Sequence, residues 1–242
     1  MKNFIAILFL LAGCAGQSRV GPDGFLFVPI KSGAYEIATW QKITNPNDLL
    51  IHIYIEGDGY AFDAYGQPTD DPTPRGDFVR DLVAQDNASN VVYIARPCQF
   101  IIGEYCKQSD WTNGRFAEKI IDAESGVIKK ISGGKKITLV GYSGGAMVSG
   151  LVIKQNPDLK IEKWITIAGV LDHKKWTEYF GDEPLMDSQN LEKLPDVPQV
   201  HFVGEYDKIV PYELALNWAK NSDIKVVKNA THNNFRDLKI FD

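Results

Sequence analysis

Residues 141–145 place a serine between glycines in a setting that could support nucleophilic chemistry. They read Gly141-Tyr142-Ser143-Gly144-Gly145, directly after the apolar run 137–140 and directly before a helical segment at 146–155. A strand, a sharp turn and a helix in this order expose the serine hydroxyl on a strained turn, where side chains at 141 and 145 would collide with neighbouring elements. The alternative is a glycine-rich turn that carries an ordinary serine.

The helix that begins beside Ser143 adds an electrostatic reason for this chemistry. Its N-terminal dipole points at the serine, and the Gly144 amide is available to donate to an oxygen that becomes negative during attack. The segment therefore predicts Ser143 as a nucleophile and Gly144 as one oxyanion donor.

The elements that must position this serine alternate along the chain. Short β-branched or aromatic runs alternate with longer helical segments from about residue 24 onward, which is typical of an α/β fold with a mostly parallel sheet. Strands are predicted at 25–28, 35–43, 49–55, 90–95, 136–141, 162–168, 199–204 and 224–228. Helices are predicted at 75–86, 116–131, 144–155 and 211–220, with a short one near the end. Because no linker or repeat interrupts the pattern, residues 14–242 are predicted to form a single domain.

The strand, turn and helix around Ser143 make the chain similar to the α/β-hydrolase superfamily, over nearly its whole length after the amino terminus. The resemblance implies a mostly parallel eight-stranded sheet flanked by helices, with at most a small lid-like segment. That segment would be 169–198, the longest stretch without a predicted strand. An irregular connection whose aromatic side chains pack on the domain is an equal alternative.

The resemblance also implies partners for Ser143, in the chain order Ser, Asp, His. Asp207 follows the strand predicted at 199–204 and resembles the family's acid, with Asp172 as the competing carboxylate. His232 follows the last predicted strand, where the family's general base lies. The remaining histidines lie in predicted strands (His52, His201) or in the 169–198 segment (His173).

A second oxyanion donor is implied in the loop after the strand at 49–55. This loop reads Glu56-Gly57-Asp58-Gly59-Tyr60, and the Asp58 amide aligns with the family's donor. Many relatives have histidine where this chain has Glu56, so Gly57 and Gly59 stay open as alternative donors. A plain glycine-rich turn is the structural alternative.

These residues together predict acyl transfer. His232 would take the proton of Ser143, Asp207 would orient the imidazole, and the Asp58 and Gly144 amides would hold the oxyanion. The predicted reaction is hydrolysis of a carboxylic ester or thioester from a small-molecule or lipid-like acyl substrate. Two alternatives remain: a catalytically silent protein that binds a component of the cell envelope, and an acyltransferase.

Composition and motifs exclude other classes of function. The 242 residues carry 26 Lys and Arg against 31 Asp and Glu, a net charge of −5, so no basic field attracts nucleic acid. The sequence has no Walker loop, no complete dinucleotide fingerprint and no H-E-x-x-H or CxxC pattern. We therefore expect neither a cofactor nor a metal ion.

The amino terminus has the character of an export signal. Lys2 and Asn3 precede the apolar run 4–12, which is too short to span a bilayer. The run ends in Leu11-Ala12-Gly13-Cys14, which resembles the lipobox of bacterial lipoproteins. This implies that 1–13 is a signal peptide and that a lipid on Cys14 anchors the protein to the cell envelope. With Ala15 after the cysteine, the expected place is the outer membrane facing the periplasm, if the source is Gram-negative; an ordinary secretory signal is the alternative.

Two further cysteines fit an exported protein. Cys98 and Cys106 lie eight positions apart in one loop, and an even pair in a disulfide-permissive compartment predicts a bridge. Two free thiols are the alternative.

Overall fold

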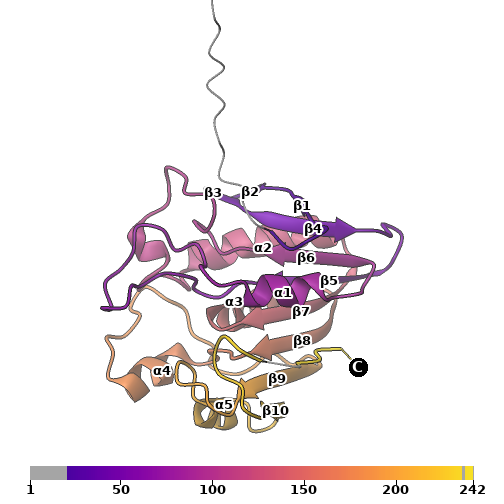
Figure 1. Ribbon diagram of the computed structural model, residues 1–242. Coiled ribbons are helices and arrows are strands. Elements are labelled where there is room, and N and C mark those ends of the chain that lie inside the picture. Colours follow the sequence, from indigo (N-terminus) through magenta and orange to yellow (C-terminus); the bar gives the residue numbers. More distant parts are fainter. Residues whose placement is uncertain (1–20, 236–237, 242) are drawn as a thin grey trace, which may run out of the picture.

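The computed structural model describes residues 21–235 and 238–241, and a large sheet with helices on both faces dominates it (Figure 1). Its eight strands follow the spatial order β1-β4-β6-β5-β7-β8-β9-β10. They are β1 (Leu26–Phe27), β4 (Thr39–Ile43), β5 (Leu50–Ile55), β6 (Asn90–Ile94), β7 (Lys136–Tyr142), β8 (Ile161–Ile167), β9 (Gln199–Gly204) and β10 (Asp223–Val227). Only β4 runs antiparallel to its neighbours, β1 and β6. The predicted mostly parallel eight-stranded sheet is confirmed.

The helices connect successive strands across the two faces of this sheet. They are α1 (Phe78–Ala84), α2 (Glu118–Ser132), α3 (Gly144–Gln155), α4 (His173–Phe180) and α5 (Tyr212–Trp218), with a 3₁₀ turn η1 (Gln108–Asp110). In Figure 1, α1 lies in front of the sheet, while α2 and α3 lie behind it. The buried helix α3 is apolar nearly all round, as a helix enclosed between the sheet and other segments requires.

Side chains alternate between the two faces of the sheet along each strand, so the sheet separates two hydrophobic clusters. Ile51, Ile53 and Ile55 of β5 point to the face that α2 and α3 cover. Tyr54 belongs to the opposite face, where it shares a cluster with Val79 and Val83 of α1. Because successive side chains of a strand point to opposite sides, continuous apolar strands bury both faces.

The structure differs from the predicted elements in three places. The strand predicted at 35–43 is two strands: β3 (Tyr35–Ile37) pairs with the unpredicted β2 (Ile30–Ser32) in a hairpin, and only β4 enters the large sheet. Helix α4 forms inside the 169–198 segment, where no helix was predicted. No helix follows α5 among the described residues, so the predicted short carboxyl-terminal helix is absent from them.

The predicted disulfide between Cys98 and Cys106 is present and closes the loop after β6. The lipidation site Cys14 and the predicted signal peptide lie outside the described residues. Within the described residues, no helix is both long enough and apolar enough to cross a membrane.

The parallel strands bring four loops to one edge of the sheet. The loops after β5, β7, β9 and β10 leave from the carboxyl ends of their strands, and these ends lie together because the strands run parallel. They carry Asp58, Ser143, Asp207 and His232, in that order.

Candidate active site

Ser143 occupies the turn between β7 and α3 with a backbone that few residues adopt. Its φ of 51° and ψ of −121° lie outside the regions favoured for residues other than glycine. The turn is held in place: the Ser143 amide donates to the Ile167 carbonyl at 3.0 Å, and its own carbonyl accepts from Ala146 and Val170. Ser143 is therefore a fixed point at the beginning of α3.

The flanking glycines are required by close packing. A Cβ on Gly141 would lie 2.5 Å from the Gly145 carbonyl oxygen, and a Cβ on Gly145 would lie 2.5 Å from the Glu56 carbonyl oxygen. Both distances are shorter than real Cβ contacts, so any larger side chain would push α3 away from β7 or from the loop after β5. The predicted collisions at 141 and 145 are confirmed.

The structure brings Ser143, His232 and Asp207 into one hydrogen-bonded chain. His232 Nε2 lies 3.0 Å from Ser143 Oγ, and His232 Nδ1 lies 2.9 Å from Asp207 Oδ2. A carboxylate can only accept at this position, so Nδ1 carries the proton and donates it, which leaves Nε2 to accept from the serine hydroxyl. This is the arrangement in which an imidazole can act as a base toward a hydroxyl.

Asp207 is fixed by the loop that follows β9. Its Oδ1 accepts from the Ile209 amide at 2.8 Å and from the Val210 amide at 2.9 Å, so Oδ2 is left for His232. The competing carboxylate, Asp172, instead caps α4, where it accepts from the Lys175 amide and the Asn190 side chain.

Tyr142 fixes the His232 loop, a contact that sequence reasoning missed. Its hydroxyl donates to Asn233 Oδ1 at 2.5 Å and lies 3.1 Å from the His232 carbonyl. Burial, together with Glu56 and Asp207, raises the pKa of Tyr142, so the hydroxyl stays protonated and remains a donor. The residue before the serine therefore orients the loop that carries the histidine.

Asp58 and Gly144, the two residues predicted to supply oxyanion donors, are in contact. The Asp58 carboxylate rests on Gly144, because a Cβ on Gly144 would lie 2.1 Å from Asp58 Oδ1. Among the described residues, neither the Asp58 nor the Gly144 amide has a hydrogen-bond partner.

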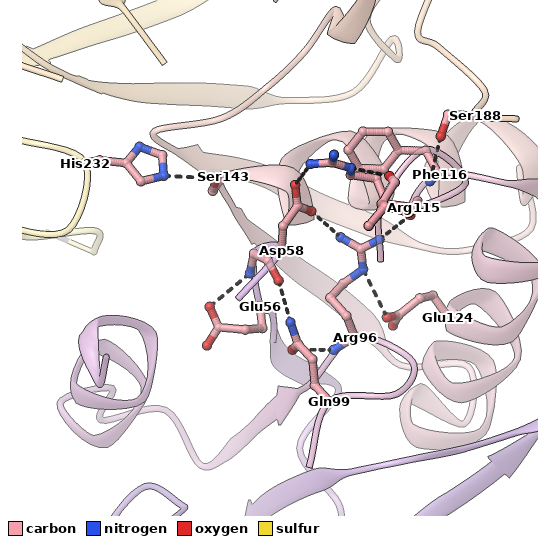
Figure 2. A network of polar contacts seen from close by, with 12 residues as sticks. Glu56, Asp58, Arg96, Gln99, Arg115, Phe116, Glu124, Ser143, Ser188 and His232 are labelled. Atoms are coloured by element: carbon pink, nitrogen blue, oxygen red, sulfur yellow. Dashed lines mark hydrogen bonds and ion pairs between the residues drawn. The ribbon is translucent and has the colours of Figure 1, made fainter. Parts of the chain in front are cut away.

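Glu56, where the sequence departs from the α/β-hydrolase resemblance, accepts two hydrogen bonds at this turn. Its carboxyl accepts from the Gly57 amide at 2.9 Å and from the Tyr93 hydroxyl at 2.7 Å, so it points away from Ser143 (Figure 2). Burial raises the pKa of Glu56, against the opposing effect of these two donors. Glu56 therefore ties the turn to β6 through Tyr93.

A cavity of about 1080 Å³ opens at Ser143 and His232. Its apolar lining comes from separate parts of the chain: Tyr60, Phe62, Phe78, Val170, Trp176, Ile209 and Phe235. Trp176 belongs to α4, and its indole donates to the Ile209 carbonyl at 2.7 Å. The 169–198 segment therefore contributes a wall of the cavity.

His201 and His52 make hydrogen bonds within the fold, away from Ser143. His201 is buried between Thr166 and Gln199, and burial lowers its pKa to about 4. His52 bonds to Asp86 at 2.7 Å at the opposite edge of the sheet. Within the described ranges, no group of three or more His, Cys, Asp or Glu side chains could hold a metal ion.

Comparison with known proteins identifies the fold. No family model matches the chain, and no curated protein matches it in sequence. Solved structures match over most of their length, and the chain has the α/β-hydrolase fold. It is similar to XC6422 from Xanthomonas campestris, described as an α/β serine hydrolase without lid (13% identity, TM-score 0.52, 87% of each chain). It is also similar to Est1E from Butyrivibrio proteoclasticus (14%, 0.57, covering 87% of this chain and 91% of that one) and to an α/β serine hydrolase homologue from Coxiella burnetii (15%, 0.56, 89% and 92%).

Proposed function

We propose that the protein is a serine hydrolase of carboxylic esters or thioesters, with Ser143 as its nucleophile. The observation that carries the proposal is the hydrogen-bonded chain from Ser143 through His232 to Asp207 at the mouth of a cavity. The names of similar structures, which include serine hydrolases, agree with it.

Each residue has a role that follows from its contacts. His232 Nε2 takes the proton as Ser143 Oγ attacks the acyl carbon, and Asp207 stabilises the imidazolium that results. The Asp58 and Gly144 amides donate to the carbonyl oxygen as it becomes negative. His232 then gives its proton to the leaving alcohol or thiol, and water releases the acyl group from Ser143 by the same steps.

The cavity supports a small or lipid-like acyl substrate. Its aromatic and aliphatic side chains offer apolar contacts to an acyl chain beside Ser143, and charged side chains such as Arg75 and Asp77 line it as well. A volume of about 1080 Å³ is ample for a small-molecule ester.

A panel of chromogenic esters and thioesters of increasing chain length tests this function. We expect turnover by the wild type, and we expect Ser143→Ala to lower kcat by about 10⁴-fold or more. Ser222→Ala, in the turn before β10, is the matched control and should keep full activity. Equal turnover by Ser143→Ala and wild type would contradict the proposal, and so would a folded wild type that is inactive on the whole panel.

We also propose that a lipid on Cys14 holds this enzyme at the bacterial cell envelope, at the outer membrane facing the periplasm in a Gram-negative source. The support is the sequence Leu11-Ala12-Gly13-Cys14 behind a short apolar run. A lipid anchor would keep the enzyme near membrane-derived acyl substrates.

Fractionation of expressing cells tests the anchor. Wild type should need detergent for release and carry a mass increase on Cys14, whereas Cys14→Ala should stay uncleaved or appear in the soluble exported fraction. Unchanged detergent-requiring association of Cys14→Ala would overturn the anchor.

A further inference from the structure

The turn that offers the Asp58 amide is held by side chains from outside the triad. Gly57 lies against the nucleophile, because a Cβ on it would be 3.1 Å from Ser143 Cβ. Any displacement of this turn therefore changes the distance between the Asp58 amide and the reacting oxygen. The groups that fix the turn are consequently relevant to the reaction.

Two arginines hold the Asp58 carboxylate. Arg115 Nη1 lies 2.8 Å from Oδ2, and Arg96 Nη1 lies 3.2 Å from Oδ1 (Figure 2). Burial alone would raise the pKa of Asp58, but Arg115 and Arg96 outweigh it and hold the pKa below its usual value. The carboxylate is therefore charged, and an unpaired negative charge here would repel an oxyanion. The two guanidinium groups remove that repulsion and fix both oxygens.

The arginines are themselves fixed. Arg115 Nε donates to the Thr112 carbonyl at 2.6 Å, and Arg96 Nη2 donates to the Arg115 carbonyl. The nearest other carboxyl to Arg96 is Glu124, 3.8 Å from its Nε. Burial raises the pKa of Glu124 to about 8, so Glu124 is mostly protonated at neutral pH and Asp58 is the charged partner of Arg96.

A third side chain holds the backbone of the same turn. Gln99 Nε2 donates to the Gly57 carbonyl at 3.0 Å, and Gln99 Oε1 accepts from the Arg96 amide at 3.0 Å (Figure 2). Gln99 lies within the loop that the Cys98–Cys106 disulfide closes, and Arg96 lies two residues before that loop. The cross-linked loop thus reaches the turn through Gln99, and Arg96, just before the loop, reaches the Asp58 carboxylate.

We propose that Arg96, Gln99 and Arg115 are positioning residues of the oxyanion hole, which act through Asp58 and Gly57 to fix the Asp58 amide beside Ser143. This rests on the proposed function. Because the oxyanion forms only in the transition state, its hydrogen bonds raise kcat more than they lower KM. Loosening the turn should therefore weaken transition-state binding selectively.

Kinetics and inhibition by an alkyl boronic acid, which forms a tetrahedral adduct with an activated serine, test this proposal. We expect Arg115→Gln to lower kcat by about 10–100-fold with KM changed by less than about threefold, within the loss known for one oxyanion donor. The boronic acid Kd should rise by a similar factor. Arg115→Lys, which keeps the charge but not the fork, should restore part of kcat.

Gln99→Leu is the second variant, since it removes the bond to Gly57 without removing a charge and serves if Arg115→Gln does not fold. It should lower kcat about tenfold and weaken the boronic acid to match. Asp86→Asn breaks a buried pair at the far edge of the sheet and should leave both quantities unchanged, as a control for general destabilisation.

The outcomes separate this proposal from the function on which it rests. An active wild type with folded variants that keep its kcat, or that lose kcat without losing boronic acid affinity, would overturn the positioning role alone. A folded wild type that neither hydrolyses esters nor binds the boronic acid would overturn the proposed function and this inference together.

Discussion

Among the described residues, two aspartate–histidine pairs lie at opposite ends of the strands of the same sheet. His232 and Asp207 are joined at 2.9 Å at the carboxyl edge, and His52 and Asp86 are joined at 2.7 Å at the other edge. Each histidine uses Nδ1. Judged by that bond alone, the two pairs are equivalent.

Their surroundings differ on the other side of each imidazole. His232 Nε2 meets the strained Ser143 at a cavity, whereas His52 is stacked on Phe241 with ring centroids 4.4 Å apart. Asp86 also accepts from Tyr54 on the same oxygen that binds His52. His52 and Asp86 also line a cavity, of about 600 Å³, so the difference between the pairs is the nucleophile: an Asp–His pair becomes a candidate base only where the fold places a serine against the free imidazole nitrogen. The other pair contributes to stability.

The largest expected effect separates the pairs by activity. In Asp207→Asn, an amide N–H can donate to His232 Nδ1, so the imidazole carries its proton on Nε2 and cannot accept the proton of Ser143. We expect kcat to fall by about 10⁴-fold while the protein stays folded. Asp86→Asn should keep wild-type kcat. Ester hydrolysis measured on both variants checks this, and equal losses would remove the distinction.

The second pair, His52 and Asp86, should matter for stability and not for activity. Asp86 accepts from His52, Tyr54 and the Ala88 amide, so Asp86→Asn leaves buried donors without an acceptor and should cost about 1–3 kcal/mol of unfolding free energy. Urea denaturation measures this cost. A variant as stable as the wild type would show that the second pair contributes nothing.

The cost of Asp86→Asn should depend on pH. Burial raises the pKa of Asp86, but the hydrogen bond from His52 and the other donors outweigh it and hold the pKa below its ordinary value of 3.8. The native state therefore binds fewer protons than the unfolded state, and this contribution is present above pH 3.8 and is lost as the pH falls through the native pKa. Wild type and Asp86→Asn should therefore converge in stability as the pH falls below the ordinary aspartate pKa, as followed by urea titrations at several pH values. A gap that stays constant from neutral to acidic pH would contradict the ionised Asp86.

The smallest effects should come from the tyrosines that support each pair. Tyr142→Phe frees the His232 loop and should lower kcat by about 3–10-fold, because the donated hydrogen bond is worth about 1 kcal/mol. Tyr54→Phe should leave kcat unchanged and cost a similar amount of stability. Steady-state kinetics and denaturation on the two variants check both statements; a kcat loss in Tyr54→Phe would break the comparison.

Sequence patterns located the loops of the site because strand ends leave strong signals. An apolar run followed by Gly-x-Ser-x-Gly placed Ser143, and the resemblance to α/β-hydrolases placed Asp207 and His232 after the strands that precede them. The disulfide followed from two cysteines in one loop. Local sequence patterns were sufficient to predict a contact where the order of the strands already brought the two residues together.

The sequence could not reveal contacts that depend on packing between distant segments. Arg96 and Arg115 are separated from Asp58 by 38 and 57 positions, and no periodicity marks them as its partners. Helix α4 is only 8 residues long and follows an irregular segment, so its helical signal was weak. The break between β3 and β4 depends on which strand each half meets, which is a tertiary choice.

The most direct test of the central claim is labelling by a fluorophosphonate serine probe, with the modified peptide located by mass spectrometry. Wild type and His52→Ala should be labelled at Ser143 at similar rates, whereas Ser143→Ala and His232→Ala should stay unlabelled. A folded wild type that resists the probe, or a His232→Ala variant labelled as fast as His52→Ala, would contradict the role of His232 as the base for Ser143.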